Sequence, residues 1–263
     1  MLGAIVGDIV GSIYEFRGAA IKTKDFPLFS EKCRFTDDTV MTFATAEALT
    51  QGGTPEHFTN AYKKYATLYP RAGYGKGFRQ WAFSDDRQPY NSYGNGSAMR
   101  VSPCGWYFSD YDETLRIAET SAAVTHNHPE GIKGAQAVAA AIYMARNGKD
   151  KQEIKNVIMS GFKYNLSRAL NDIRPRYRFD SSCAGSVPEA ITAFLESESF
   201  EDAIRNAVSL GGDSDTLAAI AGSIAEAYYG VPDAIAAKAL TYLDGRLRGE
   251  YNSWRYTISK QVI

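Results

Sequence analysis

The chain has 263 residues, of which 44% are hydrophobic and 22% are charged, which is an ordinary globular composition with enough apolar material for a large core. Its 29 basic and 30 acidic residues give a formal net charge of −1. The chain therefore lacks the excess of positive charge that is typical of proteins that bind nucleic acid or an anionic membrane. No stretch of about eighteen apolar residues occurs, and so we expect no membrane-spanning segment.

The cysteines and the N-terminal segment bear on the cellular compartment. Cys33, Cys104 and Cys183 are widely spaced and form no CxxC pair, which argues against a disulfide framework or a zinc site. The apolar run 1–6 lacks a basic region, and Asp8 interrupts it, so it is not the pattern of a signal peptide. We therefore expect a cytoplasmic protein with reduced thiols. The oligomeric state is left open by the sequence, with a monomer favoured.

The first predicted element is a buried helix. Apolar residues recur at three-and-four spacing from Leu2 to Ile13, which is the pattern of a helix face that packs in a core. Gly3, Gly7 and Gly11 repeat every four residues along it. Because glycine lowers helix stability, three glycines on one face predict the close approach of another helix. The segment lacks the Gly-Lys-Ser/Thr ending of a phosphate-binding P-loop.

Helical periodicity dominates the rest of the chain, and strand signals are nearly absent. Residues 70–103 are the exception, because glycines, polar residues and aromatics alternate there without a period, as in a long functional loop. The pattern predicts one all-α domain over residues 1–263, built from about ten helices. After the first helix, the expected helices are 38–49, 58–68, Asp112–Ala123, Gly134–Arg146, Lys151–Phe162, Val187–Leu195, Phe200–Leu210, Thr216–Tyr228 and Pro232–Leu243.

Two acidic segments, Thr36–Thr39 and Asp213–Thr216, each precede an apolar helix. Either segment could simply cap its helix. A cap needs one acceptor, however, whereas each segment offers two carboxylates and hydroxyl groups. The pair Gly211-Gly212 also allows a tight backbone path that a cap does not need. Four converging carboxylates would be costly without a counter-charge, and so we predict that divalent cations bind between them.

The type of cation follows from the ligands. Both segments supply only oxygen atoms, which favours a hard cation such as Mg²⁺, with Mn²⁺ as the alternative, over Zn²⁺. Glu15 adds a fifth carboxylate, and two divalent cations would nearly neutralise five negative charges. Two-metal sites hold their ions roughly 3.5–4 Å apart. The charge count alone leaves one or two ions open.

Four motifs together resemble one protein family. They are G-A-I-V-G-D-I-V-G-S-I-Y-E from Gly3, F-T-D-D-T-V from Phe35, G-N-G-S-A-M-R-V-S-P from Gly94 and L-G-G-D-S-D-T-L-A-A-I-A-G from Leu210. In this order and spacing the chain resembles the ADP-ribosylglycohydrolases, including those that activate dinitrogenase reductase. The resemblance implies a compact, orthogonal multi-helix fold with a two-magnesium centre. The metal ligands that it implies are Thr36, Asp37, Asp38, Asp213, Asp215 and Thr216.

One branch of this family, which removes ADP-ribose from serine, is the most similar. Its features are S-I-Y-E ending at Glu15, G-Y-G at 73–75, S-Y-G-N-G at 92–96 and T-H at 125–126. The resemblance implies that Glu15 is the catalytic residue. Arginine-specific relatives carry an aspartate in the loop that matches 93–100, and this chain has no acid there. Serine-linked or other O-linked substrates are therefore favoured over arginine-linked ones.

The glycine-rich loop 91–96 is either an ordinary turn cluster or a binding element whose N–H groups face a diphosphate. The resemblance implies the second role, with polar contacts from the loop, a tyrosine stacked on adenine, an opposite wall at 73–77 and a histidine that contacts ribose or phosphate. The predicted substrate-binding residues are Ser92, Tyr93, Gly94, Asn95, His126 and Gly75.

These features predict a magnesium-dependent hydrolase that cleaves the glycosidic bond between ADP-ribose and a modified protein or related conjugate. The alternatives are an arginine-type ADP-ribosyl hydrolase, a two-metal phosphoester hydrolase and a non-catalytic ADP-ribose-binding protein. Asp8 lies about two helical turns before Glu15 and is assigned a supporting role. Arg174, Arg176 and Arg178 are interpreted as a solvated loop, with binding of an acidic target as the alternative.

Overall fold

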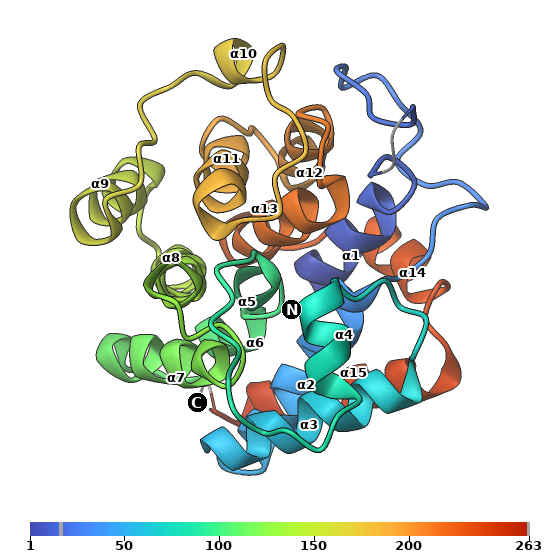
Figure 1. Cartoon of the computed structure of the whole chain (residues 1–263). Helices are drawn as coiled ribbons and strands as arrows, with labels where there is room; N and C mark the ends of the chain where they lie inside the picture. Colours follow the sequence, from blue (N-terminus) through green and yellow to red (C-terminus); the bar gives the residue numbers. More distant parts are fainter. Residues whose placement is uncertain (16–17, 262–263) are drawn as a thin grey trace.

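Two helices that lie far apart in the sequence pack together at the centre of the fold. The computed structural model describes residues 1–15 and 18–261, and these residues form helices and no strand (Figure 1). Helix α1 (Leu2–Gly11) lies antiparallel against α13 (Ser214–Tyr229). The all-α class is therefore confirmed.

The predicted glycine face explains this packing. A Cβ atom placed on Gly3 would lie 2.0 Å from the carbonyl oxygen of Gly222, and one on Gly7 would lie 2.0 Å from that of Ala218. At Gly11 it would lie 2.5 Å from the Cα of Asp215. Real carbon atoms do not approach so closely, so only glycine lets the two backbones meet. The expectation that another helix approaches this face is confirmed.

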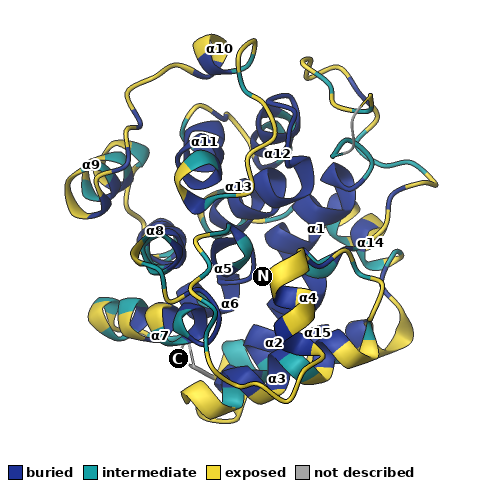
Figure 2. Cartoon of the chain, in the orientation of Figure 1, coloured by how far each residue is buried: buried dark blue, intermediate teal, exposed yellow. Residues whose placement is uncertain are grey.

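The other helices surround this pair. Helices α8, α11 and α12 pack against α13, while α2 packs against α1, α3 and α6. The central helices are buried, whereas α9 and α10 lie at the periphery with exposed faces (Figure 2). The remaining bounds are α2 Asp37–Thr50, α3 Pro55–Leu68, α4 Lys76–Ala82, α5 Gly96–Met99, α6 Ser102–Tyr107, α7 Tyr111–Ala123, α8 Pro129–Arg146, α9 Lys151–Phe162, α10 Leu170–Ile173, α11 Cys183–Leu195, α12 Phe200–Val208, α14 Asp233–Leu240 and α15 Gly245–Gln261.

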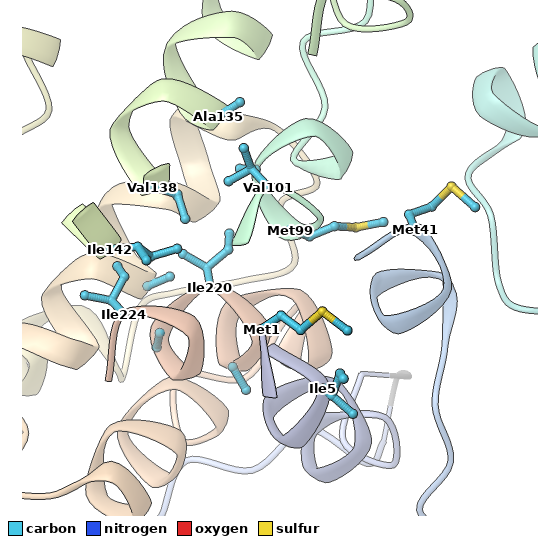
Figure 3. Close-up of a cluster of buried hydrophobic side chains, with 14 of the residues drawn as sticks. Met1, Ile5, Met41, Met99, Val101, Ala135, Val138, Ile142, Ile220 and Ile224 are labelled. Atoms are coloured by element: carbon cyan, nitrogen blue, oxygen red, sulfur yellow. The ribbon is translucent and has the colours of Figure 1, made fainter. Parts of the chain in front are cut away.

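Apolar side chains from five helices or their ends meet in the core (Figure 3). Ile5 comes from α1, Met41 from α2, Met99 from α5, Val138 from α8 and Ile220 from α13. All five are buried. The core therefore joins the helices that carry the two acidic segments, so that those segments are held by a rigid interior.

Several helix boundaries differ from the expected ones. The segment 70–103, expected as a loop, contains α4, α5 and the start of α6. Helix α11 begins at Cys183 rather than Val187, because the Ser182 hydroxyl accepts a hydrogen bond from the Gly185 N–H and caps it. Helix α15 was not expected. It buries Leu247, Tyr251 and Trp254. Three apolar residues in a mostly polar segment are too few to give a clear helical periodicity.

None of the helices in residues 1–15 and 18–261 combines the length and the apolar character needed to cross a bilayer. Cys33, Cys104 and Cys183 are buried free thiols.

We predict that Gly7→Ala lowers the free energy of unfolding by about 1–3 kcal/mol, because the added methyl group overpacks the α1–α13 contact. Urea unfolding followed by circular dichroism measures this change. Gly161→Ala is the matched control, since a Cβ at this position in α9 meets no atom within 4 Å. The control should unfold at the same or a higher urea concentration. Equal stability of Gly7→Ala and wild type would contradict the packing argument.

Candidate metal centre and substrate cavity

The predicted site residues gather around one cavity of about 450 Å³. It lies where the segment after α1 meets the N-termini of α2 and α13. The predicted residues that line it are Glu15, Thr36, Asp37, Asp38, Gly75, Ser92, Gly94, Asn95, His126, Asp213, Asp215 and Thr216. Tyr93 does not line the cavity. Its side chain is exposed and lies edge-on to His128, with ring centroids 5.6 Å apart, so stacking of Tyr93 on adenine stays a prediction.

The carboxylates form two overlapping clusters. Asp8, Asp38 and Asp215 offer oxygen atoms that lie within 4.8 Å of one another, and so do Glu15, Asp213 and Asp215. The four aspartates are buried and Glu15 is half-buried. Asp215 belongs to both clusters, so it lies between two groups of acidic oxygens. This arrangement brings together the two acidic segments and Glu15, as the sequence predicted.

Asp8 fixes the start of α2. One of its carboxylate oxygens accepts hydrogen bonds from the N–H groups of Thr36 and Thr39, at 2.8 and 3.0 Å. The other accepts one from the Thr36 hydroxyl at 2.7 Å. Three donors hold this carboxylate, which ties the end of α1 to the acidic segment of α2. Asp8 thus has the supporting contacts expected of it, and it also contributes an oxygen to one cluster.

Asp38 leaves one oxygen without a partner. Its Oδ2 accepts from the hydroxyls of Thr36 and Thr216, each at 3.4 Å. Its Oδ1 is buried and has no hydrogen-bond partner. Buried polar atoms almost always have a partner. An unpartnered oxygen on a carboxylate that belongs to an acidic cluster is therefore the arrangement expected of a cation ligand.

Asp37 and Asp213 are placed by glycine backbone. A Cβ on Gly73, whose φ is +121°, would lie 2.9 Å from the Asp37 Oδ1. The turn before Asp213 uses Gly211 and Gly212, with φ values of +66° and +88°. Both values lie in the left-handed region that favours glycine. The predicted tight path before the second acidic segment is confirmed.

The loop 92–96 is joined to the same centre through Asn95. Its side-chain amide donates to the Asp213 Oδ2 at 2.7 Å and to the Ser186 hydroxyl at 3.0 Å. Its backbone N–H donates to the carbonyl oxygen of Ser181 at 2.8 Å. Asn95 therefore orients a carboxylate of the cluster, and its predicted contact with a substrate stays a prediction.

Burial raises the pKa of each of these carboxyl groups, and for Glu15, Asp37, Asp38 and Asp215 repulsion by neighbouring carboxylates adds to it. Burial, reinforced by neighbouring carboxylates, raises the pKa of Asp37 to about 8 and raises the pKa values of Asp38 and Asp215 well above their usual range. Burial and then Asp213 raise the pKa of Glu15. Bound divalent cations would reverse this penalty, because they favour the ionised carboxylates. The oxygen-only ligands, the clusters and the unpartnered Asp38 oxygen all fit such cations.

A chain of hydrogen bonds determines how His126 faces the cavity. The Arg100 guanidinium, which can only donate, bonds to the Thr125 hydroxyl oxygen at 2.8 Å. The Thr125 hydroxyl lies 2.7 Å from the His126 Nδ1. The other acceptor in reach of the Thr125 proton, the carbonyl oxygen of Ala122, is more distant at 3.5 Å. We therefore infer that Thr125 donates to Nδ1 and that neutral His126 carries its proton on Nε2. Burial and then Arg100 hold the pKa of His126 well below its usual range.

This Nε2–H group lies beside the glycine-rich loop. A Cβ on Gly96 would lie 3.1 Å from the His126 Nε2, and one on Gly94 would lie 3.6 Å from it. Glycine at these positions keeps the imidazole accessible from the cavity. His126 is therefore placed as a neutral hydrogen-bond donor toward a bound acceptor such as a phosphate or ribose oxygen.

Some lining residues were not predicted. Tyr90, Arg100 and Phe179 line the cavity. Arg100 lies within a motif that the sequence singles out, and its 1% exposure marks a buried cation that periodicity could not reveal. Phe179 follows the arginine cluster and carries no sequence signal, because only the fold brings that loop to the cavity.

Comparison with known proteins decides the family. The family model described as ADP-ribosylglycohydrolase matches residues 1–256. The chain belongs to the ADP-ribosylglycohydrolase family. As an ADP-ribosylglycohydrolase it is a glycosidic hydrolase, and the predicted enzyme class is confirmed.

Individual relatives of this ADP-ribosylglycohydrolase bear different names. ADP-ribosylhydrolase ARH3 of Bos taurus is 28% identical, over 88% of this chain and 84% of the relative. ADP-ribosylarginine hydrolase Tri1 of Pseudomonas putida (strain GB-1) is 27% identical, over 88% of this chain and 70% of the relative. A solved structure titled ADP-ribosylglycohydrolase-related protein complex matches with a TM-score of 0.74 and 24% identity, covering 100% of this chain and 97% of that chain. That likeness shows the fold.

We predict that, without divalent cations, the carboxylate cluster makes the free energy of unfolding depend on pH. In EDTA the folded protein keeps a proton on Asp37 up to a pH of about 8, whereas the unfolded chain releases it near pH 4. The folded state therefore binds more protons between these values, so its stability falls as pH rises. Relative to Asp37→Asn, the free energy of unfolding of wild type should fall from pH 5 to pH 8, measured by urea titration. Saturating MgCl₂ should flatten this trend, and a rising trend in EDTA would contradict it.

We predict that Thr125→Val increases KM for an ADP-ribosylated substrate by roughly 3- to 10-fold while kcat changes little, because one hydrogen bond that orients His126 is lost. The ¹⁵N shifts of the histidine rings report the tautomer directly, since the chain has only 3 histidines. Thr67→Val is the control, because the exposed Thr67 hydroxyl bonds only to its own helix. An unchanged His126 tautomer in Thr125→Val would exclude the proposed chain of hydrogen bonds.

Proposed function

We propose that this chain is a magnesium-dependent hydrolase that cleaves the O-glycosidic bond joining ADP-ribose to a serine-type side chain of a protein or to a related conjugate. The observation that carries the proposal is the position of Glu15. It lies within 4.8 Å of Asp213 and Asp215, oxygen to oxygen, on the wall of the cavity that the glycine-rich loop also lines. The proposed residue range of the catalytic domain is 1–263.

Two groups of residues would bind different parts of the substrate. Ser92, Gly94 and His126 lie on the part of the cavity built from the loop before α5 and the segment between α7 and α8, which suits the diphosphate and adenosine portion. The carboxylates suit the distal ribose, whose C1″ carries the scissile bond. Relatives include proteins named ADP-ribosylhydrolase and ADP-ribosylarginine hydrolase. The lack of an acidic residue in the loop 93–100 supports the O-linked class for this chain.

Two Mg²⁺ ions are proposed, held by Thr36, Asp37, Asp38, Asp213, Asp215 and Thr216, with Asp8 behind them and Mn²⁺ as a substitute. When bound, such ions supply positive charge that orients ribose hydroxyls and increases the acidity of water.

The reaction needs one proton transfer that Glu15 can perform. The bond between C1″ and the side-chain oxygen breaks, a water oxygen bonds to C1″, and the leaving oxygen gains a proton. Glu15 is half-buried on the wall of the cavity, where a carboxyl group can exchange a proton with a substrate or water molecule bound beside it. Glu15 thus either takes the proton of the attacking water or gives one to the leaving oxygen.

We predict that the wild-type protein releases free ADP-ribose from a serine-linked ADP-ribosyl peptide, and much more slowly from an arginine-linked one, as measured by chromatography of the products. Glu15→Gln should lower kcat by about 10²–10⁴ while Kd for ADP-ribose changes little. EDTA and Asp215→Asn should abolish release while the circular dichroism spectrum persists, and MgCl₂ should restore activity after EDTA.

Other outcomes would select the alternatives. Release of AMP would identify a phosphoester hydrolase, and faster release from the arginine-linked peptide would identify an arginine-type enzyme. Binding of ADP-ribose without any release would leave a non-catalytic binding protein. Unchanged turnover in EDTA would reject the metal assignment.

A further inference from the structure

A second hollow adjoins the cavity on the side of Glu15. Its volume is about 980 Å³, and Glu15 and Phe179 line both spaces. If Glu15 marks the scissile bond, as the proposed function requires, the ADP-ribose portion occupies the cavity. The remainder of the substrate then leaves past Glu15 into this hollow, which we call the outer groove. Its lining includes Lys22, Arg178, Phe179 and Gly212.

Two segments without helix line the outer groove, residues 18–22 and residues 175–179; the second connects α10 to α11 (Figure 1). They meet at the turn before Asp213. A Cβ on Gly212 would lie 3.1 Å from the carbonyl oxygen of Arg178, and one on Gly211 would lie 3.3 Å from that of Ile21. The same glycine pair that shapes the metal centre therefore lets both segments approach it.

Lys22 joins the two segments. Its ammonium group donates to the carbonyl oxygen of Tyr177 at 2.9 Å and to that of Leu210. The Arg178 guanidinium donates to the same Tyr177 oxygen at 2.8 Å and to that of Pro175 at 3.1 Å. Both cations are thus held by backbone carbonyls at defined places, rather than extending freely into water.

Within the described part of the chain, these cations form no ion pair. Among residues 1–15 and 18–261, no carboxylate forms an ion pair with Lys22, Arg174 or Arg178. Burial lowers the pKa of Lys22, and repulsion by the nearby charges of Arg178 and Arg174 adds to this effect. Asp180, the acidic residue nearest to Arg178 in the sequence, accepts hydrogen bonds from the N–H and hydroxyl of Ser182 and so caps a turn instead.

An aromatic side chain lies between the two spaces. Phe179 is 57% exposed, although a ring of this size usually lies inside a protein. Pro175 and Tyr177 add apolar surface to the same groove. An exposed ring beside two cations suits a polypeptide that contributes both apolar and acidic side chains.

We propose that the outer groove binds the polypeptide segment around the modified residue, and that Lys22 and Arg178 select targets with acidic residues beside the ADP-ribosylated one. This proposal rests on the proposed function, because it takes Glu15 as the point of cleavage. It assigns the loop 174–179 a role in target selection. Charge complementarity and continuity with the substrate cavity support a protein segment as the occupant.

The test compares three substrates that carry the same serine-linked ADP-ribose. They are a peptide with glutamates beside the modified serine, the same peptide with lysines instead, and the ADP-ribosyl-serine amino acid without flanks. Wild type should have a kcat/KM roughly threefold to tenfold higher for the acidic than for the basic peptide. Arg178→Glu should abolish or reverse this preference while kcat/KM for the amino acid stays within about twofold.

Arg248→Glu is the matched control, because Arg248 is exposed on α15 and does not line the groove. It should keep the wild-type preference. Equal kcat/KM for the two peptides in wild type would overturn the proposal. ADP-ribose oligomers serve as a fourth substrate. If Arg178→Glu lowered kcat/KM only for these oligomers, the proposal would also be overturned, because phosphates and not acidic side chains would then be the ligand.

A binding measurement separates this proposal from the proposed function. Fluorescence anisotropy of the labelled acidic and basic ADP-ribosyl peptides, with Glu15→Gln as the background, does not depend on turnover. Tighter binding of the acidic peptide that is lost on adding Arg178→Glu would support the outer groove even if no substrate were cleaved. Equal binding of both peptides would overturn it even if serine-linked ADP-ribose were released rapidly.

Discussion

The close contact between α1 and α13 is the constraint on which the site depends. Gly3, Gly7 and Gly11 let the two backbones touch, and the antiparallel arrangement brings the C-terminal end of α1 to the N-terminal end of α13. Asp8 and Asp215 are therefore neighbours although about two hundred residues separate them. A wider spacing between these helices would separate the carboxylates of Asp8 and Glu15 from those of Asp213 and Asp215.

The carboxylate cluster lowers the stability of the fold, and neighbouring polar groups offset only part of this effect. Its acidic groups repel one another in a buried setting, and the raised pKa values of Asp38 and Asp215 express that cost. Helix N-termini, the hydroxyls of Thr36 and Thr216 and the amide of Asn95 offset part of it. The unpartnered Asp38 oxygen shows that the offset is incomplete, which distinguishes this cluster from a polar core whose buried groups all have partners.

The sequence predicts the parts of this protein whose causes are local or periodic. The glycine spacing of α1, the paired acidic segments and Gly211-Gly212 each express a local requirement, and the structure brings them together. Three-dimensional placement limits the rest. Tyr93 belongs to a motif yet faces His128, while Phe179 has no motif and lines the cavity. Helix α15 was not predicted because three buried residues make too weak a pattern.

The order of the site residues along the chain has a consequence for biosynthesis. The first acidic segment is made early, but Asp213, Asp215 and Thr216 follow only after most of the polypeptide has been synthesised. A nascent chain on the ribosome thus carries Glu15 and Asp38 without the groups that complete their clusters. Under the proposed function, hydrolysis requires α13 to have docked, so a truncated product that ends before this helix would be inactive even if its remaining helices folded.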